Sequence, residues 1–357
     1  MMESVDMNLE ELVRSCREKN ASDIHICGSG EVYIRVFGEL VRYPGEFTRQ
    51  DVENWIDDML PNKEKDRELI GQRVDLNFCY SLPQTDLRHR VNIFYQRGEV
   101  EAVLRILNDD VPSYEVLNLP PVVSKLAELH SGLVLVTGPT GSGKSTTLAS
   151  MVDYINSRHK KHIITIEDPI EYVYKKRMSL IRQREIGVDV PTFQEALRSA
   201  LREDPDVILV GEMRDYETIS VALTAAETGH LVFSTLHTIG AVATVDRIID
   251  VFPTSSQQQV RTQLATVLQG VVTQTLVPRP DRQGRQVATE IMLRNDAVAN
   301  LIRDDKCHQI DAMLDTSIRE GMHTLNWDLA RLVNLGKINR EDALNVTSNR
   351  KRLLELL

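Results

Sequence analysis

This sequence lacks the features that mark membrane-spanning, exported and zinc-binding proteins. No apolar run approaches the roughly 18 residues that a membrane span needs, and residues 1–6 do not have the pattern of a signal peptide. The four cysteines lie far apart without a C-x-x-C pair, so neither a zinc site nor a redox motif is expected. The sequence therefore predicts a soluble, cytoplasmic protein with reduced thiols.

The chain also lacks an excess of positive charge. Its 357 residues carry a formal net charge of −10, and 42% of them are hydrophobic and 26% charged, which is typical of globular proteins. An acidic chain is not expected to coat nucleic acid. Two basic clusters, 158–162 and 175–177, could line a local groove, but such runs are more often solvated surface. We expect no nucleic-acid partner.

The pattern of apolar residues changes along the chain and predicts two domains. In the first part, helices alternate with strands of period two, which predicts a compact α+β domain over residues 1–107. Helices are expected at 7–18 and 49–60, and strands at 24–26, 32–36, 75–80, 88–96 and 101–107. A polar, proline-marked linker or hinge is expected at 108–121.

Residues 122–357 are expected to form the second domain. Short buried-type strands are predicted at 133–137, 162–166, 207–210 and 231–235, with helices at 192–202 and 215–228. Alternating strands and helices are typical of an α/β fold with a parallel sheet covered on both faces. The chain after residue 255 is predicted to be mostly helical.

Residues 138–146, G-P-T-G-S-G-K-S-T, fit the spacing of a phosphate-binding loop between a strand and a helix. Glycines allow backbone N–H groups to approach phosphate oxygens, and the start of the helix adds free N–H groups and partial positive charge. We expect Lys144 to reach the terminal phosphates of ATP and the Ser145 hydroxyl to ligate Mg²⁺. The nucleotide-binding residues are predicted to be Gly138, Thr140, Gly141, Ser142, Gly143, Lys144, Ser145 and Thr146.

Three polar clusters follow predicted strands, at 167–171, 211–215 and 236–238. Because ligands of open α/β sheets bind beyond the carboxyl ends of the strands, these clusters are expected to converge on the phosphates. Carboxylates there can orient a water for attack on the γ-phosphate and bind the shell of Mg²⁺. The pattern therefore favours hydrolysis over mere binding. No N-K-x-D motif occurs, which disfavours a small GTPase.

Five segments, 138–146, 165–171, 196–206, 210–215 and 228–238, resemble the secretion ATPase superfamily and, within it, the PilT family of type IV pilus retraction ATPases. The chain is short and has no four-cysteine zinc motif, unlike extension and type II secretion ATPases. Residues 297–306 resemble the A-I-R-N-L-I-R-E signature of retraction, with Val298, Ala299 and Asp304 replacing Ile, Arg and Glu.

The resemblance implies roles for individual residues. Glu171 corresponds to the catalytic glutamate that activates water, and Glu212 to the second acid, which acts on the Mg²⁺ shell. His230 and His237 would sense the γ-phosphate and link the site to its neighbour.

The resemblance also implies an assembly. It predicts a PAS-like N-terminal domain, a RecA-like ATPase domain with a helical C-terminal part, and a homohexameric ring whose sites are completed by arginines, for which Arg97 and Arg105 are candidates. The ring would act on an inner-membrane pilus platform protein, docked at the inner face of the membrane.

Three alternatives remain open from the sequence. The same enzyme class could power pilus extension, DNA uptake or secretion. A RecA-like nucleic-acid motor could use the basic clusters as a groove. A nucleotide-gated scaffold would bind ATP without turnover.

Overall fold

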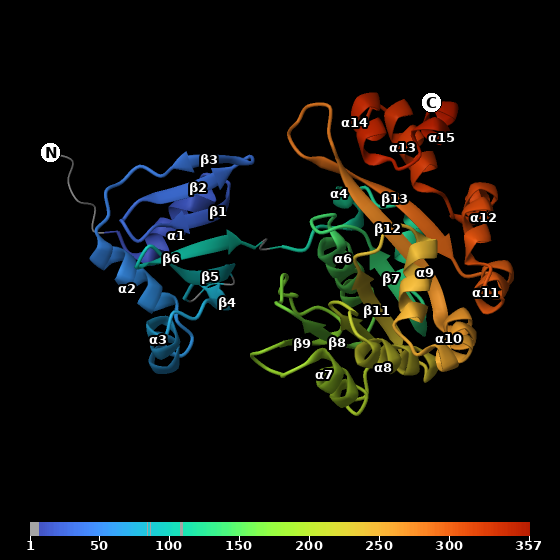
Figure 1. Ribbon diagram of the computed structural model, residues 1–357, viewed down its shortest axis with the longest axis horizontal. Coiled ribbons are helices and arrows are strands. Elements are labelled where there is room, and N and C mark those ends of the chain that lie inside the picture. Colours follow the sequence, from blue (N-terminus) through green and yellow to red (C-terminus); the bar gives the residue numbers. More distant parts are fainter. Residues whose placement is uncertain (1–6, 84, 86, 108–109) are drawn as a thin grey trace. The chain divides into compact units, whose positions relative to one another are not determined.

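The computed structural model describes residues 7–83, 85, 87–107 and 110–357, whose elements form two compact units (Figure 1). The first unit consists of the described residues up to Asp110 and of Glu171–Val173. The second consists of Val111–Ile170 and Tyr174–Leu357. The first two residues of the predicted linker, 108 and 109, lie outside the described residues.

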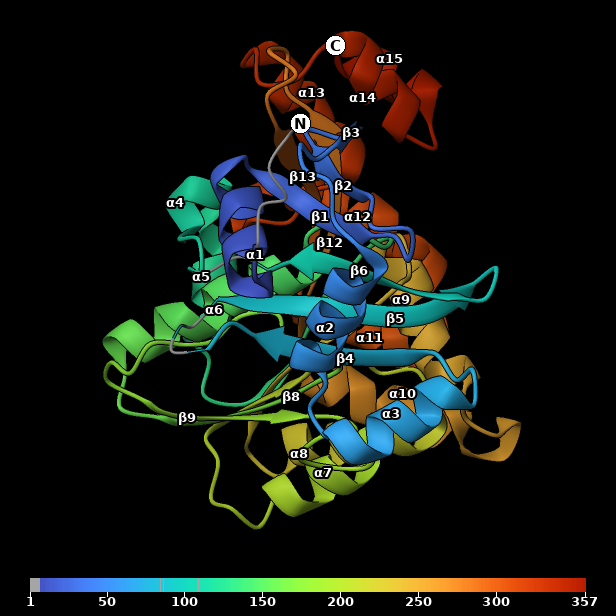
Figure 2. The same cartoon turned by 90° about the vertical axis from the view of Figure 1, so that its left-hand side faces the viewer.

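The first unit is a six-stranded antiparallel sheet in the order β3-β2-β1-β6-β5-β4. Helices α1 and α2 pack on it, as Figure 2 shows. The helices and strands predicted for this part are confirmed, and β3 and α3 are additional. The elements are α1 (Leu9–Glu18), β1 (Ala21–Ile26), β2 (Val32–Val36), β3 (Glu39–Arg42), α2 (Arg49–Met59), α3 (Lys63–Gly71), β4 (Leu76–Ser81), β5 (Arg88–Gln96) and β6 (Glu99–Ile106).

Local sequence explains why these elements form. Helix α1 begins with a capping box, because the Asn8 side chain accepts the Glu11 N–H (2.9 Å) and the Glu11 carboxylate accepts the Asn8 N–H (3.2 Å). In β6, Ala102 and Leu104 point into the core. The alternation of a strand places Arg105 on the opposite face, where it is exposed.

The second unit is a seven-stranded sheet in the order β13-β12-β7-β11-β10-β8-β9. All neighbours are parallel except β12 and β13, which form an antiparallel hairpin. Its strands are β7 (Gly132–Thr137), β8 (His162–Glu167), β9 (Leu180–Glu185), β10 (Val207–Val210), β11 (Leu231–Leu236), β12 (Leu268–Pro278) and β13 (Arg285–Leu293).

Helices cover both faces of this sheet. Leu133 and Leu135 of β7 belong to one buried cluster, whereas Val134 and Val136 belong to another that includes α6. This confirms the predicted α/β fold. The helices are α4 (Tyr114–Leu117), α5 (Pro121–Ala127), α6 (Lys144–Arg158), α7 (Phe193–Ala200), α8 (Tyr216–Glu227), α9 (Ala241–Asp250), α10 (Thr254–Val267), α11 (Asp296–Arg303), η1 (Cys307–Gln309), α12 (Ile310–Thr316), η2 (Ile318–Glu320), α13 (Leu325–Asn334), α14 (Arg340–Val346) and α15 (Arg350–Leu356).

One prediction for this part was incomplete in a way that matters for the site. Helices do make up most of the chain after residue 255, but two strands that were not predicted, β12 and β13, occupy 268–278 and 285–293. Strand β12 has buried residues on both of its faces, as a central strand does. A run of that kind has no period-two alternation, so apolar spacing alone does not separate it from a buried helix.

A buried histidine of the first unit gives a prediction about stability. His89 is 0% exposed, and its Nε2 accepts a hydrogen bond from Arg17 Nε (3.1 Å). Burial, helped by the charge of Arg17, lowers the pKa of His89 from 6.5 to about 4. Between these two pH values the unfolded chain binds a proton that the folded chain does not. Acidification through this window should therefore cost up to about 3 kcal/mol of the free energy of unfolding.

His89→Gln should remove this loss while keeping an acceptor for Arg17. The chain has two tryptophans, Trp55 in the first unit and Trp327 in the second. In a Trp327→Phe background, denaturation followed by Trp55 fluorescence at about pH 7 and about pH 4 reports on the first unit alone. An equal pH dependence with and without His89 would contradict the assignment.

Candidate nucleotide site

The phosphate loop lies between β7 and α6, in the context that the sequence predicts. Three of its glycines have positive φ angles: Gly138 (136°), Gly141 (77°) and Gly143 (88°). Side chains rarely adopt these angles, so the loop's path depends on glycine. Gly143 is the N-cap of α6 and offers no capping side chain. The first N–H groups of α6 have no partner within the helix, which makes this end a suitable place for an anion.

Lys144 lies over the loop that precedes it. Its side chain is buried, and its Nζ donates to the carbonyl oxygens of Gly138 (2.8 Å) and Pro139 (3.0 Å). The ammonium group is thereby held at the end of α6 where the helix begins. Thr140, Gly141 and Ser145 are exposed, and Thr146 is half-buried. The loop therefore combines a positive charge, backbone N–H donors and the hydroxyl of the exposed Ser145.

Strand β12 supports the loop from behind, which the sequence did not predict. The amide of Gln274 donates through Nε2 to the Ser142 carbonyl (2.7 Å) and accepts through Oε1 from the Thr147 hydroxyl (2.9 Å). A Cβ added to Gly138 would lie only 2.2 Å from the Gln274 carbonyl oxygen. The loop is thus pressed against β12. The signal in the sequence was a glutamine in an apolar run, within a region for which no strand was predicted.

A cavity of about 240 Å³ adjoins the first turn of α6, beside Thr146 and Thr147. Its lining is of two kinds. Apolar side chains such as Leu276 and Val287 can pack against a flat base, and cations, Arg279, Arg285 and Lys337, can pair with an anion. Residues 116–119 close it from the segment that the sequence assigned to the linker.

The structure brings Glu212 and His237 together at the carboxyl ends of β10 and β11. The Glu212 carboxylate is largely buried, with Oε1 2.7 Å from Arg214 Nε and Oε2 3.5 Å from His237 Nε2. The Gly211 N–H donates to the Ile166 carbonyl at 2.8 Å. A side chain at Gly211 would crowd the end of β8, which explains the glycine before Glu212. Together these contacts place a carboxylate beside an imidazole at the edge that carries the phosphate loop.

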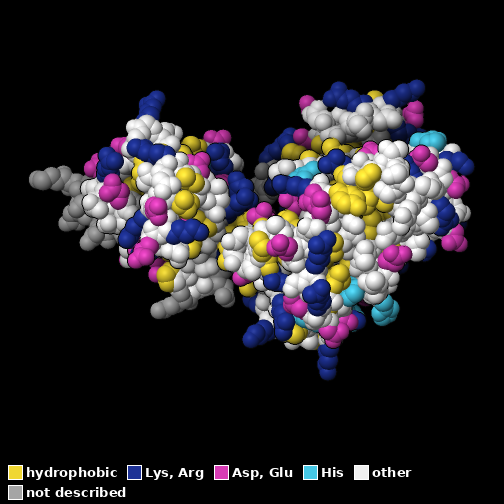
Figure 3. All heavy atoms as spheres, turned by 60° about the horizontal axis from the view of Figure 1, so that its bottom comes forward, with side chains coloured by type: hydrophobic (Ala, Val, Ile, Leu, Met, Phe, Trp, Pro, Cys, Tyr) yellow, Lys and Arg dark blue, Asp and Glu magenta, His cyan; other side chains and the backbone are white. Residues whose placement is uncertain are grey.

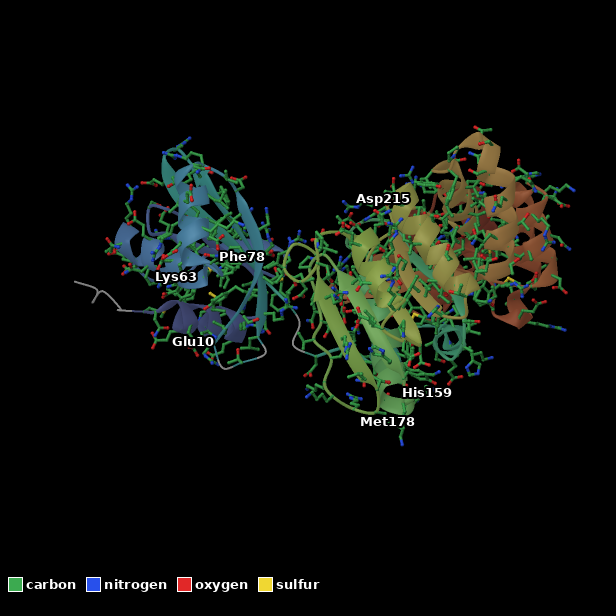
Figure 4. The ribbon with its side chains drawn as sticks, turned by 90° about the horizontal axis from the view of Figure 1, so that it is seen from below. Glu10, Lys63, Phe78, His159, Met178 and Asp215 are labelled. Atoms are coloured by element: carbon green, nitrogen blue, oxygen red, sulfur yellow. The ribbon has the colours of Figure 1, made fainter. Side chains whose placement is uncertain are left out.

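His230, in contrast, lies at the other end of the sheet. It precedes β11, and its carbonyl accepts the N–H of Gly132, the first residue of β7. The ring Nδ1 lies 3.0 Å from the Ala225 carbonyl. A strand of six residues spans about 20 Å, so His230 is not brought together with His237. Figure 4 shows the two ends of the sheet. Asp215 lies at the end where β10 stops, and His159 and Met178 lie at the opposite end.

The acidic segment after β8 is anchored by its neighbours. Glu167 accepts hydrogen bonds from the Thr165 hydroxyl (2.6 Å) and from Gln183 Nε2 (3.3 Å). The Ile170 N–H donates to the buried Glu185 carboxylate at 3.1 Å. Glu171 follows this anchor directly, with a half-buried side chain. The anchored backbone thus extends to Ile170, the residue before Glu171.

The two candidate arginines lie in the first unit at opposite ends of β6. Arg97 is exposed in the β5–β6 turn, with φ +52°. Arg105 lies near the far end of β6, about 20 Å along the strand. Its Nε donates to Asp23 Oδ1 (3.0 Å), while the side chain is 65% exposed. Burial would raise the pKa of Asp23, but hydrogen bonds from Ser22 and Arg105 and the charge of Arg105 lower it overall. Asp23 thus holds the Arg105 guanidinium in place, while most of the side chain remains exposed.

Comparisons with known proteins show which family this chain belongs to. A model of the family described as "Type II/IV secretion system protein" matches residues 2–353. The chain is 48% identical over 317 residues to the twitching motility protein of Neisseria gonorrhoeae (88% of this chain, 84% of that one). It is 45% identical over 338 residues to the type IV pilus retraction ATPase PilT of Pseudomonas aeruginosa (94% and 97%). A crystal structure of the pilus retraction motor PilT with bound ADP superimposes with a TM-score of 0.91 at 43% identity, covering 98% of this chain and 100% of that one.

The contacts of Gln274 generate a prediction about nucleotide affinity. Gln274→Met preserves volume but leaves the buried Ser142 carbonyl without its donor, a loss of about 1–3 kcal/mol. Because the phosphate loop then samples other conformations, the dissociation constant for ADP should rise about tenfold or more. Isothermal titration calorimetry measures this directly.

A matched control lies one residue earlier. Thr273→Val removes the buried hydrogen bond between the hydroxyls of Thr273 and Thr137 (2.8 Å), and neither hydroxyl is bonded to the phosphate loop. This control should lower stability without weakening ADP binding. Equal ADP affinities in both variants would show that Gln274 does not shape the loop.

Proposed function

This chain belongs to the type II/IV secretion system protein family, and we propose that it is an ATP-hydrolysing motor that powers retraction of type IV pili. The observation that carries the proposal is the phosphate loop held on β12, with Lys144 over its carbonyls and Glu212 beside His237 at the same edge of the sheet. Two relatives that match 88% and 94% of this chain are named for twitching motility and pilus retraction. The ADP of the related crystal structure supports nucleotide binding here.

Hydrolysis needs a water placed in line with the γ-phosphate and a group to take its proton. In this proposal Glu171 orients and deprotonates that water, from its anchored backbone after Ile170. Lys144 and the N–H groups of the loop stabilise charge on the transferred phosphoryl group. His237, linked to Glu212, senses whether the γ-phosphate is present. His230 contributes to the contact with a neighbouring chain, because it lies far from the phosphate loop of its own chain.

Mg²⁺ would accompany ATP at this site. It usually binds through one or two protein oxygens together with phosphate oxygens and water. The exposed Ser145 hydroxyl and the Glu212 carboxylate are oxygens of this kind, at the start of α6 and the end of β10. Bound there, the metal would neutralise phosphate charge.

The proposed assembly is a homohexameric ring. It comprises a PAS-like domain (1–107), a hinge (108–121) and a RecA-like domain (122–357). Arg105, and as a second candidate Arg97, completes the ATP site of a ring neighbour or of its own chain. Arg105 is the better candidate, because Asp23 already holds its guanidinium in place while 65% of the side chain stays exposed. ATP binding would close the hinge, and release of phosphate would reopen it.

The work of the ring would be delivered to a pilus platform protein of the inner membrane. No helix in the described part of the chain is long and apolar enough to cross a membrane. We therefore propose a cytoplasmic chain that docks at the inner face of the membrane through this partner.

Two other functions predict different measurements. A pilus extension ATPase would differ in output, so that its deletion removes pili instead of increasing their number on the cell, and deletion of a secretion ATPase would leave the number of pili unchanged. A nucleic-acid motor would show ATPase activity stimulated by DNA with a steep salt dependence. On the face shown in Figure 3, the described Lys and Arg side chains are interspersed with Asp and Glu instead of forming one stripe. This distribution favours a protein partner.

Glu171→Gln tests both the chemistry and the output. The amide keeps the shape of the side chain but cannot take a proton, so ATP binding should remain within about threefold while kcat falls at least a hundredfold. Cells that carry this variant in place of the wild type should accumulate surface pili and lose twitching. Near-normal hydrolysis would remove Glu171 from the role of base, and loss of pili would favour extension.

Mixing two inactive variants tests the shared site. If Arg105 acts on a neighbour, a ring mixed from Arg105→Ala and Glu171→Gln chains contains interfaces with both wild-type residues, and ATPase activity returns. If Arg105 acts within its own chain, no mixture exceeds its components. The control is the same mixture prepared under conditions that block subunit exchange, which should stay inactive.

A further inference from the structure

A single carboxylate on β13 contacts the starts of two helices. Glu290 is partly buried, and its Oε1 accepts the N–H of Ala241 (2.9 Å), the first residue of α9. Its Oε2 accepts the N–H of Leu325 (3.4 Å), the first residue of α13. Anions are favoured at helix N-termini, where N–H groups lack partners within the helix. The two helices are thereby fixed to one side chain although 84 residues of chain separate their first residues.

Helix α9 depends on this contact, because its own N-cap is Gly240 and offers no side chain. The segment 237–240 links His237 to α9. The Thr244 hydroxyl donates to the Gly240 carbonyl (2.7 Å) and lies 2.7 Å from the Thr238 hydroxyl, which ties the segment to the first turn of the helix. A movement of His237 is therefore passed to the Ala241 N–H, and from there to Glu290.

The neighbouring positions of the β12–β13 hairpin connect the same helices to the phosphate loop. Glu290 pairs with Thr273, and Thr289 pairs with Gln274. Gln274 holds the loop, as described above. Thr289 donates through its N–H (2.8 Å) to the buried carboxylate of Asp328, which lies in α13. The Thr289–Asp328 contact thus fixes α13 to the hairpin, whereas Glu290 contacts both α13 and the start of α9.

We propose that Glu290 is a positioning residue for ATP hydrolysis, which couples the His237 segment to the C-terminal helices that begin with α13. This inference rests on the proposed function. The Glu290 carboxylate is planar and accepts one hydrogen bond from the start of each helix. A displacement of one helix start that moves the carboxylate therefore changes its hydrogen bond to the other. Nucleotide that shifts His237 would in this way alter α13, more than about 80 residues later in the chain.

The alternative is that Glu290 only stabilises the fold. Glu290→Gln separates the two. The amide is isosteric, but its NH₂ group faces one of the two backbone N–H groups, so one end of the link is lost. The matched control is Asp328→Asn, a second buried carboxylate that accepts a backbone N–H of the same hairpin but does not contact α9.

The experiment measures hydrogen–deuterium exchange of residues 325–334 in the full-length protein with and without ADP. We expect ADP to slow exchange there in the wild type and in Asp328→Asn, and to have no such effect in Glu290→Gln although ADP still binds. For ATP hydrolysis, kcat of Glu290→Gln should fall about ten- to a hundredfold with little change in KM. A role in stability alone would lower the unfolding temperature of both variants and leave the ADP response in both.

The outcomes are distinguishable. Absence of an ADP effect on residues 325–334 of the wild type, with ADP bound, overturns the inference and leaves the proposed function intact. A response that persists in Glu290→Gln also overturns it. Failure of the wild type to bind ADP overturns the proposed function itself. If Glu290→Gln does not fold, Glu290→Asp replaces it, because the shorter side chain cannot reach both helices. The measurement on the wild type needs neither variant.

Discussion

A glycine-rich loop can present its N–H groups to a phosphate only if something holds its shape, and here that support is β12. Gly138 lies so close to the Gln274 backbone that a Cβ would overlap it. The Gln274 side chain makes one bond to the loop and one to α6. Both bonds are buried, so a loop conformation that breaks either leaves a polar group without a partner. This requirement selects one loop conformation before any nucleotide arrives, which lowers the entropic cost of binding it.

The polarity of the parallel sheet then decides what else can reach the phosphates. Strands β7, β10 and β11 run in the same direction, so the residues after them share one edge. Glu212 and His237 meet there within 3.5 Å. His230 is only seven positions before His237 in the sequence, yet a strand stands between them. The two histidines therefore have different surroundings. Within one chain, both of them cannot contact the same phosphate.

Much of this could be predicted from sequence because the signals were local. The phosphate loop is contiguous, and strands such as β7 and β11 are short apolar runs before polar clusters. The failures share a physical cause. Strand β12 is buried on both sides and carries no alternation. Gln274 acts on a loop about 130 positions earlier, and nothing near it marks that contact. Glu290 is similar, since its partners are backbone N–H groups, which any residue supplies.

The β12–β13 hairpin joins the phosphate loop to two helices of the same unit. Its first strand forms the back of the phosphate loop, and its second strand holds α9 and α13. Each of these contacts gives a hydrogen-bond partner to a backbone group of the phosphate loop or of a helix start. An ATP-driven motor must convert a small change at a phosphate into movement elsewhere, and packed elements shift between discrete arrangements instead of deforming smoothly. A rigid hairpin bonded at both sides meets this demand, because it cannot adjust to the loop without also adjusting to the helices.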